Sequence, residues 1–252
     1  MLIFTILSTG LFARPFYIAH RGASYLAPEN TVASAKLAWE LGADAVEIDI
    51  YLSLDNKVMV IHDKDTKRIC KEEDNKVIKS TSSIDLRKLD AGIWKGEKFK
   101  GEKIPFLSEI IETVPEGKTL VVEIKCGSEV IPAMKECIDK SGKSDQIVFI
   151  SFGWETIIDT REAFPGNKCY WLSSDKSVLK KKIKESAKIG LDGVNLHYNV
   201  VDKKVVKAAF SRGLEVLAWT VDNPEEARRL IRLGVTKITT NRPAWLKEQL
   251  EM

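Results

Sequence analysis

The sequence predicts one (β/α)8 barrel of the TIM-barrel type, an α/β fold, with a small insertion after a hairpin that begins at its second strand. Eight strand-like apolar runs follow residue 14, and most of them precede a helical segment. The 252 residues of the chain agree with the ~250 typical of such barrels. Doubly wound sheets are the alternative, but the chain contains neither GxGxxG nor GxxxxGK(S/T), the two common nucleotide-binding loops.

Strands and helices are expected to alternate along the whole barrel. The eight strand-like runs are 16–19, 45–52, 120–124, 147–151, 168–172, 193–196, 215–221 and 236–239. The helical segments are 30–41, 106–114, 130–140, 154–163, 178–189, 202–212, 224–233 and 244–250. Asn30 or Thr31 can serve as N-cap of the first helix, which Gly42 ends. Pro224 lies near the first position of the seventh helix, and Gly234 closes it.

A further strand-like run at 58–61 follows the second strand after only a few residues. A parallel crossover needs about a dozen residues or more, so the connection is too short for one. The two runs are therefore predicted to form an antiparallel hairpin that turns at residues 54–56. Such a hairpin brings His62 back beside Glu47 and Asp49 of the second strand.

Residues from about 64 to 104 are polar and show little periodicity. A structureless loop of roughly 40 residues is unusual inside a compact domain. We therefore expect this segment to be an insertion with a small structure of its own that caps the site. Its two large aromatic residues, Trp94 and Phe99, are the expected anchors.

The first 13 residues are apolar and have no counterpart in the barrel, which we expect to form one catalytic domain over 14–252. They resemble the h-region of a signal peptide cut near Ala13, although no basic n-region precedes them. The alternative is an N-terminal strand or arm packed on the bottom of the barrel. A signal peptide would make the protein periplasmic or secreted, and its absence cytoplasmic. No run reaches the ~18 apolar residues of a membrane span.

The composition is that of an ordinary globular protein. Hydrophobic residues make up 44% and charged residues 30%, and the net charge of +3 is too small to indicate binding to nucleic acid or to a membrane surface. None of the four cysteines forms a CxxC pair, so the chain has no zinc signature. The cysteine redox state and the oligomeric state remain open at this stage.

Three carboxylates are expected to meet at the carboxyl ends of neighbouring strands, where such barrels carry their sites. Glu47 and Asp49 lie two residues apart in a strand and therefore point to the same face. Glu123 ends the next strand, and three buried like charges cannot all stay ionised unpaired. A divalent cation would remove the conflict, and oxygen ligands favour Ca²⁺ or Mg²⁺. Nearby histidines leave zinc or manganese possible, and ion pairs with Arg21 and Lys125 are the alternative.

Two of the three histidines, His20 and His62, lie at strand ends beside this acidic cluster. Lone histidines are more often structural, but a pair that titrates near neutral pH can divide the roles of base and acid. For a phosphodiester, one histidine would take a proton from the attacking oxygen and the other would protonate the leaving alcohol. Arg21 offers a planar fork suited to phosphate, and Lys125 would add positive charge or orient a metal ligand.

Several motifs in this order resemble the glycerophosphodiester phosphodiesterase family. They are His20-Arg21-Gly22, Pro28-Glu29-Asn30-Thr31, Gly42-Ala43-Asp44, Glu47-Ile48-Asp49, His62-Asp63, Glu123-Ile124-Lys125 and Trp219-Thr220-Val221. The resemblance implies that the chain, with one divalent cation on the three acids, hydrolyses a small-molecule glycerophosphodiester to glycerol 3-phosphate and an alcohol. It also admits the substrate's own glycerol 2-hydroxyl as the attacking group, through a cyclic phosphate that water opens.

The resemblance also suggests roles for the remaining site residues. His20 is assigned as base and His62 as acid, although the order can be reversed. Glu29 and Asn30 belong to the matching ENT motif and are expected to position Arg21 or a metal ligand. Asp63 is expected to orient the neighbouring histidine or the hairpin. Trp219 matches an aromatic residue that lines the family's pocket, with a place in the barrel core as the alternative.

Two segments depart from the family pattern. Arg68-Ile69-Cys70 stands where the family usually has RTT, and Asn241 stands where an Asp is usual. We expect neither segment to touch the metal or the histidines, so the departures bear on the choice of alcohol and not on the reaction class. A lysophospholipase D-like or C-like lipid phosphodiesterase is one rival interpretation. A barrel that binds a phosphorylated ligand without turning it over is the other.

Overall fold

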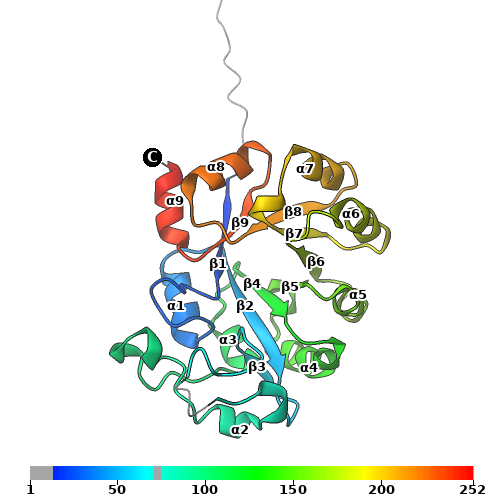
Figure 1. Ribbon diagram of the computed structural model, residues 1–252. Helices are drawn as coiled ribbons and strands as arrows, with labels where there is room; N and C mark the ends of the chain where they lie inside the picture. Colours follow the sequence, from blue (N-terminus) through cyan, green and yellow to red (C-terminus); the bar gives the residue numbers. More distant parts are fainter. Residues whose placement is uncertain (1–13, 71–74, 252) are drawn as a thin grey trace, which may run out of the picture.

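The structure is a computed structural model that describes residues 14–70 and 75–251 (Figure 1). The signal peptide or N-terminal arm expected over the first 13 residues lies outside the described residues. No helix in the described ranges has the length and apolar character needed to cross a membrane.

Eight parallel strands close into a barrel, as the sequence predicted. Around the sheet they follow the order β1-β9-β8-β7-β6-β5-β4-β2, and pairing of β1 with β2 closes it. The strands are β1 (Phe16–His20), β2 (Ala45–Leu52), β4 (Thr119–Ile124), β5 (Ile147–Ser151), β6 (Lys168–Ser173), β7 (Gly193–His197), β8 (Glu215–Trp219) and β9 (Lys237–Thr240). The short strand β3 (Val58–Val60) pairs antiparallel with β2 outside this count.

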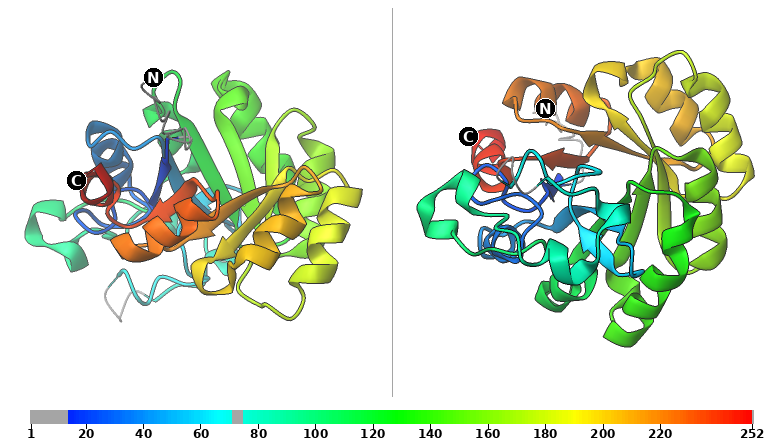
Figure 2. Two further views of the ribbon diagram at one scale, coloured as in Figure 1. Left: turned by 90° about the horizontal axis from the view of Figure 1, so that it is seen from above. Right: turned by 60° about the horizontal axis from the view of Figure 1, so that its bottom comes forward.

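Helices surround the barrel, and most follow the strand before them (Figure 1). They are α1 (Val32–Glu40), α3 (Leu107–Thr113), α4 (Ile131–Ser141), α5 (Trp154–Ala163), α6 (Leu179–Lys188), α7 (Lys203–Phe210), α8 (Pro224–Arg232) and α9 (Pro243–Glu251). Thr31 caps α1 by accepting a hydrogen bond from the Ser34 backbone N–H, and Ser34 returns the contact in a capping box. The two views of Figure 2 show the same ring from other sides.

The interior of the barrel changes character along its axis. Side chains of alternate strand residues point inward, and those in the barrel interior form an apolar cluster that includes Ala45, Val121 and Tyr170. Two residues further along the same inward rows stand Glu47 and Glu123. The barrel interior is therefore a packed apolar core toward the amino ends of the strands, and the carboxyl ends of the strands carry the polar groups.

The predicted hairpin is confirmed. Strands β2 and β3 pair antiparallel with Ile50 opposite Val60, and the turn closes by a 2.9 Å hydrogen bond from the Ser53 N–H to the Lys57 carbonyl. Asn56 has a φ of 57°, a left-handed conformation that Asn tolerates better than most residues. The Ile61 N–H then donates to the Asp49 carbonyl at 2.9 Å, and this bond holds the residue before His62 against β2.

The segment between β3 and α3 has its own secondary structure, as expected, but different anchors. It contains α2 (Ser83–Leu86) and the 3-10 helices η2 (Ile78–Ser80), η3 (Ile93–Lys95) and η4 (Glu97–Phe99). The expectation that Trp94 and Phe99 anchor it is wrong, because Trp94 is 42% exposed and Phe99 is only partly buried. Aliphatic residues of the segment pack instead on Met59 and Ile61 of the hairpin; they are Ile69, Ile78, Leu86, Leu89, Ala91 and Ile104.

Candidate active site

Three buried carboxylates meet at the carboxyl ends of β2 and β4. Glu47, Asp49 and Glu123 are 2%, 1% and 8% exposed, and each offers an oxygen within 4.8 Å of the oxygens of the other two. The register of the parallel strands sets Asp49 directly opposite Glu123. The predicted acidic cluster is therefore present, and its members point to one place.

The cluster is electrostatically unfavourable on its own. Burial, and then the charges of Asp49 and Glu123, raise the pKa of Glu47 well above its ordinary value. Burial and the charge of Asp49 raise the pKa of Glu123 to about 7. Glu47 Oε1 and Asp49 Oδ1 have no hydrogen-bond partner within the described residues. Such orphaned buried oxygens are costly, and they suit a hard divalent cation with oxygen ligands.

Two basic side chains flank the acids, as the ion-pair alternative proposed. Lys125 Nζ lies 2.9 Å from Glu123 Oε1 and 3.6 Å from Asp49 Oδ1. Arg21 Nε lies 3.3 Å from Asp49 Oδ2, and the Arg21 backbone N–H donates to Glu47 Oε2 at 2.9 Å. Two cations against three carboxylates leave the cluster short of positive charge, so these ion pairs and a bound cation are compatible.

The loop after β1 is bent tightly to make these contacts. Arg21 has a φ of 57° and Gly22 a φ of 78°, and a Cβ atom on Gly22 would lie 2.5 Å from Ser34 Oγ. Glycine is therefore required there. Asn30, also at a φ of 57°, donates from Nδ2 to Asp49 Oδ2 at 2.8 Å and accepts at Oδ1 from the Asp49 N–H at 3.1 Å.

His62 reaches the acids from the hairpin. Its Nδ1 lies 2.7 Å from Asp63 Oδ1, and its Nε2 lies 3.2 Å from Lys125 Nζ. Burial lowers its pKa below the ordinary value, while the charge of Asp49 and the contact with Asp63 act in the opposite direction. The predicted contact between Asp63 and the neighbouring histidine is thus present.

His20 reaches the acids from the end of β1, opposite Glu47 in register. Burial and the positive charge of Arg21 lower its pKa to about 4, so the ring is neutral at physiological pH. Its Nδ1 lies 2.7 Å from Asn241 Oδ1. The expectation that Asn241 touches neither histidine is therefore wrong, because closure of the barrel places the end of β9 beside β1.

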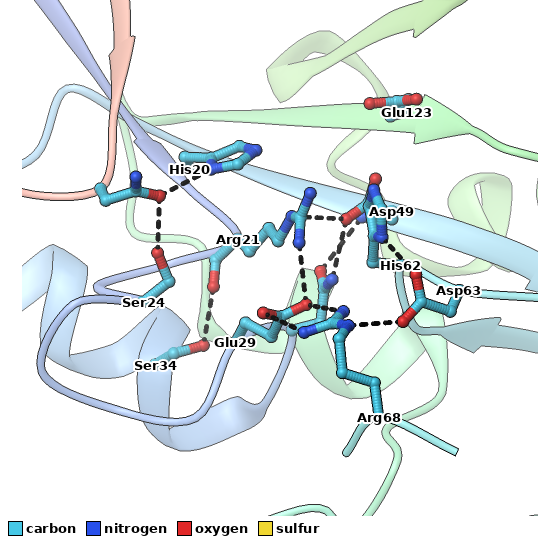
Figure 3. A network of polar contacts seen from close by, with 12 residues as sticks. His20, Arg21, Ser24, Glu29, Ser34, Asp49, His62, Asp63, Arg68 and Glu123 are labelled. Atoms are coloured by element: carbon cyan, nitrogen blue, oxygen red, sulfur yellow. Dashed lines mark hydrogen bonds and ion pairs between the residues drawn. The ribbon is translucent and has the colours of Figure 1, made fainter. Parts of the chain in front are cut away.

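Arg68 contacts the carboxylate that pairs with His62, whereas no contact between Arg68 and a histidine ring is present among the described residues, so the expectation for this segment stays a prediction. Arg68 donates from two guanidinium nitrogens to both oxygens of Glu29, at 2.6 and 2.9 Å, and from Nε to Asp63 Oδ2 at 2.6 Å. Glu29 in turn accepts from Arg21 Nη1 at 3.0 Å. The network in Figure 3 thus runs from Arg21 through Glu29, Arg68 and Asp63 to His62.

The opposite side of the rim is aromatic. Trp219, at the end of β8, donates from Nε1 to the Asn195 carbonyl at 3.2 Å. Its ring packs edge-on against Phe152 and His197, with centroids 5.5 and 5.0 Å away. Phe152 is 45% exposed and was not among the predicted site residues, although it directly follows a strand end. Trp219 also packs on the apolar cluster of the barrel interior, as the core alternative required, and its contact with a substrate stays a prediction.

An open pocket of about 570 Å³ lies beside His62, the histidine of the hairpin. It is lined by Tyr51, His62, Asp63, Lys64, Asp65, Lys67, Arg68 and Lys125.

Asp222 is a polar neighbour of the site that the sequence analysis missed. It accepts hydrogen bonds from Thr240 Oγ1 and from the backbone and side-chain N–H groups of Asn241. The only sequence signal for it was a carboxylate three residues after the β8 tryptophan.

The chain was compared with known proteins. A glycerophosphodiester phosphodiesterase of Caldanaerobacter subterraneus subsp. tengcongensis is 34% identical over 237 residues, which span 91% of this chain and 95% of that protein. A lysophospholipase D of Rattus norvegicus is 26% identical over 270 residues, which span 93% of this chain and 85% of that protein.

A solved structure of similar fold also comes from a phosphodiesterase. An Oleispira antarctica phosphodiesterase, in complex with the product sn-glycerol-3-phosphate, matches with a TM-score of 0.88 and 29% identity over 95% of this chain and 98% of that one. The sequence profile of the Glycerophosphoryl diester phosphodiesterase family matches residues 20–245, a range that includes every candidate site residue named above. The chain therefore belongs to the glycerophosphoryl diester phosphodiesterase family.

Proposed function

We propose that this enzyme hydrolyses glycerophosphodiesters to glycerol 3-phosphate and an alcohol, with one bound divalent cation. The observation that carries the proposal is the convergence of two histidines from separate elements on the buried acids Glu47, Asp49 and Glu123. Membership of the family supports the substrate class. The catalytic unit is proposed to be a single domain over residues 14–252.

Glu47, Asp49 and Glu123 would hold the cation, since they supply only oxygen ligands and include orphaned buried oxygens. Ca²⁺ or Mg²⁺ fits such a donor set. When bound, the cation would offset part of the negative charge of the three carboxylates and of the non-bridging oxygens of the phosphate. Arg21 and Lys125 would add their positive charges on the same phosphate oxygens. Glu29 and Asn30, which contact Arg21 and Asp49, would hold these groups in place.

The two histidines would divide the proton transfers. His20 is paired with a neutral amide and its ring stays neutral, so it would take the proton from the attacking hydroxyl of water or of the substrate's glycerol. As the new P–O bond forms, the bond to the leaving alcohol breaks, and His62 would supply the proton that the alcohol needs. Burial is the largest influence on the pKa of His62 and lowers it, whereas the charge of Asp49 and the Asp63 carboxylate beside Nδ1 act toward the protonated ring that this role requires.

The test is activity on glycerophosphocholine, assayed as released glycerol 3-phosphate, with and without EDTA. His20→Ala and His62→Ala should each lower kcat by about 10²–10⁴, the usual contribution of a positioned acid or base. His197→Ala is the matched control, because the third histidine packs on Trp219 and contacts none of the acids. It should change kcat by less than about tenfold. Wild-type turnover in both site variants would refute the acid–base assignment.

A lysophospholipid is the second candidate substrate. The loop after β1 exposes two large apolar side chains beside the site, Tyr25 at 55% and Leu26 at 51%, and these could contact an acyl chain. Comparing kcat/KM for lysophosphatidylcholine and glycerophosphocholine separates the two substrates. If Leu26→Ser lowers only the value for the lysolipid, the loop contacts the acyl chain.

The location of the enzyme depends on the segment before the barrel. We propose that residues 1–13 are an export signal, which would place the mature enzyme in the periplasm or outside the cell. Without export it would act in the cytoplasm. N-terminal sequencing of the enzyme recovered from separated cell fractions decides between the two.

A further inference from the structure

A short chain of polar groups lies behind His20, on the side away from the acids. Asn241, at the end of β9, places its Oδ1 2.7 Å from His20 Nδ1 and its Nδ2 2.6 Å from Asp222 Oδ2. Asp222 Oδ1 is held separately, because it accepts the Asn241 backbone N–H and Thr240 Oγ1, both at 2.8 Å. Ser24 Oγ is a second donor to Asn241 Oδ1, at 3.1 Å.

The chemistry of these groups fixes every proton in the chain. A carboxylate can only accept hydrogen bonds, so the atom of Asn241 that faces Asp222 must be the NH₂ group. The amide oxygen then faces His20 and can only accept, so Nδ1 of the ring must carry the proton. A neutral imidazole protonated on Nδ1 has an unprotonated Nε2, which is the nitrogen pointing away from Asn241.

We propose that Asp222 and Asn241 are positioning residues that hold His20 in the Nδ1–H form and leave Nε2 ready to accept a proton. A general base must present its lone pair to the attacking group, and in the opposite tautomer Nε2 would carry a proton and could not act. The consequence for turnover rests on the proposed function, whereas the tautomer itself can be observed without any substrate.

The two histidines are held by different chemistry, which gives the inference its specificity. His62 faces the Asp63 carboxylate directly, and that acceptor imposes an Nδ1–H bond, while Nε2 faces the Lys125 ammonium. His20 faces the uncharged end of an amide, and the carboxylate stands one residue further back. The arrangement fixes the tautomer of His20 without placing a negative charge against the ring.

The isosteric variant Asp222→Asn tests this arrangement. Oδ1 of the new side chain can still accept from Thr240 and the Asn241 N–H, but an NH₂ group replaces Oδ2. The Asn241 amide should then turn over and present its own NH₂ group to His20, which forces the Nε2–H tautomer. The chain has only three histidines, so ¹⁵N NMR of the Mg²⁺-loaded protein can assign the tautomer of each ring.

We expect His20 to be Nδ1–H in the wild type and Nε2–H in Asp222→Asn, with His62 unchanged. The kcat for glycerophosphocholine should fall on the order of a hundredfold while KM changes little, because substrate contacts are untouched. Asp202→Asn is the matched control. Asp202 caps α7 through the Lys204 and Val205 N–H groups, Asn serves equally well as an N-cap, and neither tautomer nor kcat should change.

The exchange variant Asp222→Asn/Asn241→Asp adds a second test, and it decides the matter if the single variant fails to fold. The carboxylate then faces His20 and the amide stands behind it, so Nδ1–H should return and part of the lost kcat with it. An Nδ1–H ring in Asp222→Asn, or full kcat with an Nε2–H ring, would overturn the inference. A wild type that is inactive on every glycerophosphodiester would instead refute the proposed function. The His20 tautomer measured by NMR would still test the role of Asp222.

Discussion

The rim of the barrel divides into two arcs of opposite character. The acidic arc, formed by the ends of β1, β2 and β4 with the β3 hairpin, carries Glu47, Asp49, Glu123 and two histidines. The aromatic arc, formed by the ends of β5, β7 and β8, carries Phe152, His197 and Trp219. The acidic arc carries more negative than positive charge, whereas the aromatic arc is held by ring packing. The two arcs meet where Lys125 Nζ lies 5.9 Å from the centroid of the Phe152 ring. The difference suggests that the acidic arc performs the chemistry while the aromatic arc shapes the space for the organic part of the substrate.

The two arcs also differ in what holds them together. The side chains of the aromatic arc find their packing partners within the protein itself. The acidic arc contains orphaned oxygens on Glu47 and Asp49, which cost free energy until a cation binds. Loss of the cation should therefore damage one arc and leave the other nearly unchanged.

The largest effect is expected from neutralising one acid. Glu123→Gln removes a proposed metal ligand and a charge while keeping the shape of the side chain. We expect kcat/KM to fall by about 10³ or more, as for the loss of a metal that stabilises developing charge. The midpoint of a Mg²⁺ or Ca²⁺ titration of activity should also rise.

Glu129→Gln is the control for this variant. Glu129 is exposed and lies just beyond β4 in η5 (Ser128–Val130), and its carboxylate only accepts from the nearby Gly127 N–H. Its activity should stay within about twofold of wild type, as for most surface substitutions. Equal losses in the two variants would show that carboxylates near β4 matter for folding and that Glu123 has no special part.

The next effect concerns stability without metal. The pKa of Glu123 is raised from 4.5 to about 7, so the folded state binds this proton more tightly than the unfolded state. This stabilisation is complete below pH 4.5 and is lost as the pH rises through about 7. His20, whose pKa is lowered to about 4, acts in the opposite direction below pH 6.5. We therefore expect the contribution of Glu123 to the free energy of unfolding in EDTA, taken as the difference between wild type and Glu123→Gln, to fall by up to about 3 kcal/mol between pH 5 and pH 8.

Denaturant unfolding at several pH values measures this slope. Saturating Ca²⁺ should flatten it, because the cation binds the ionised carboxylates and stabilises the folded state most at high pH. Glu123→Gln cannot titrate at this position and should show a smaller slope in EDTA. Equal pH slopes for wild type and Glu123→Gln in EDTA would contradict the electrostatic account of the acidic arc.

The residues of the acidic arc could be predicted from the sequence more fully than the contacts that hold them in place. The spacing of Glu47 and Asp49, together with strand alternation, was enough to place the acids on one face, and the short connection to residue 58 was enough for the hairpin. The Asn241 contact with His20 could not be foreseen, because it joins residues 221 positions apart in the chain. Only the register of the closing strands β1 and β9 brings them together, and hydrophobic periodicity carries no information about that register.

The insertion teaches the same lesson about packing. Trp94 and Phe99 were expected to anchor it because large apolar side chains gain most from burial. The hairpin instead offers Met59 and Ile61, and the aliphatic residues of the insertion fill the space on them. The shape of the hairpin surface determines which residues of the insertion are buried. The sequence of the insertion carries no information about that shape.

A smaller effect is expected at Arg68, which links the insertion to the acidic arc. Arg68→Gln removes the charged fork that holds Glu29 and Asp63, so Arg21 and His62 should both lose orientation. We expect kcat to fall about tenfold, a typical cost for a group that orients catalytic residues. Arg68→Lys should recover only part of it, since an ammonium lacks the planar fork that binds both oxygens of Glu29 and also Asp63. Lys79, an exposed lysine of η2, lies outside the pocket beside His62 and has no ion pair among the described residues, so Lys79→Gln should be neutral.

The smallest effect should come from the aromatic arc. Trp219→Phe keeps an aromatic ring but loses the hydrogen bond to the Asn195 carbonyl, and Trp219→Ala loses the packing on Phe152 and His197 as well. We expect KM to rise roughly threefold in the first variant and about tenfold in the second, with kcat nearly unchanged, because contacts to the unreacting part of a substrate bind ground state and transition state alike. Steady-state kinetics on glycerophosphocholine measures both constants. If Trp219→Ala instead lowers kcat as far as Glu123→Gln does, then both arcs serve the transition state, and the separation of chemistry from shape along the rim does not hold.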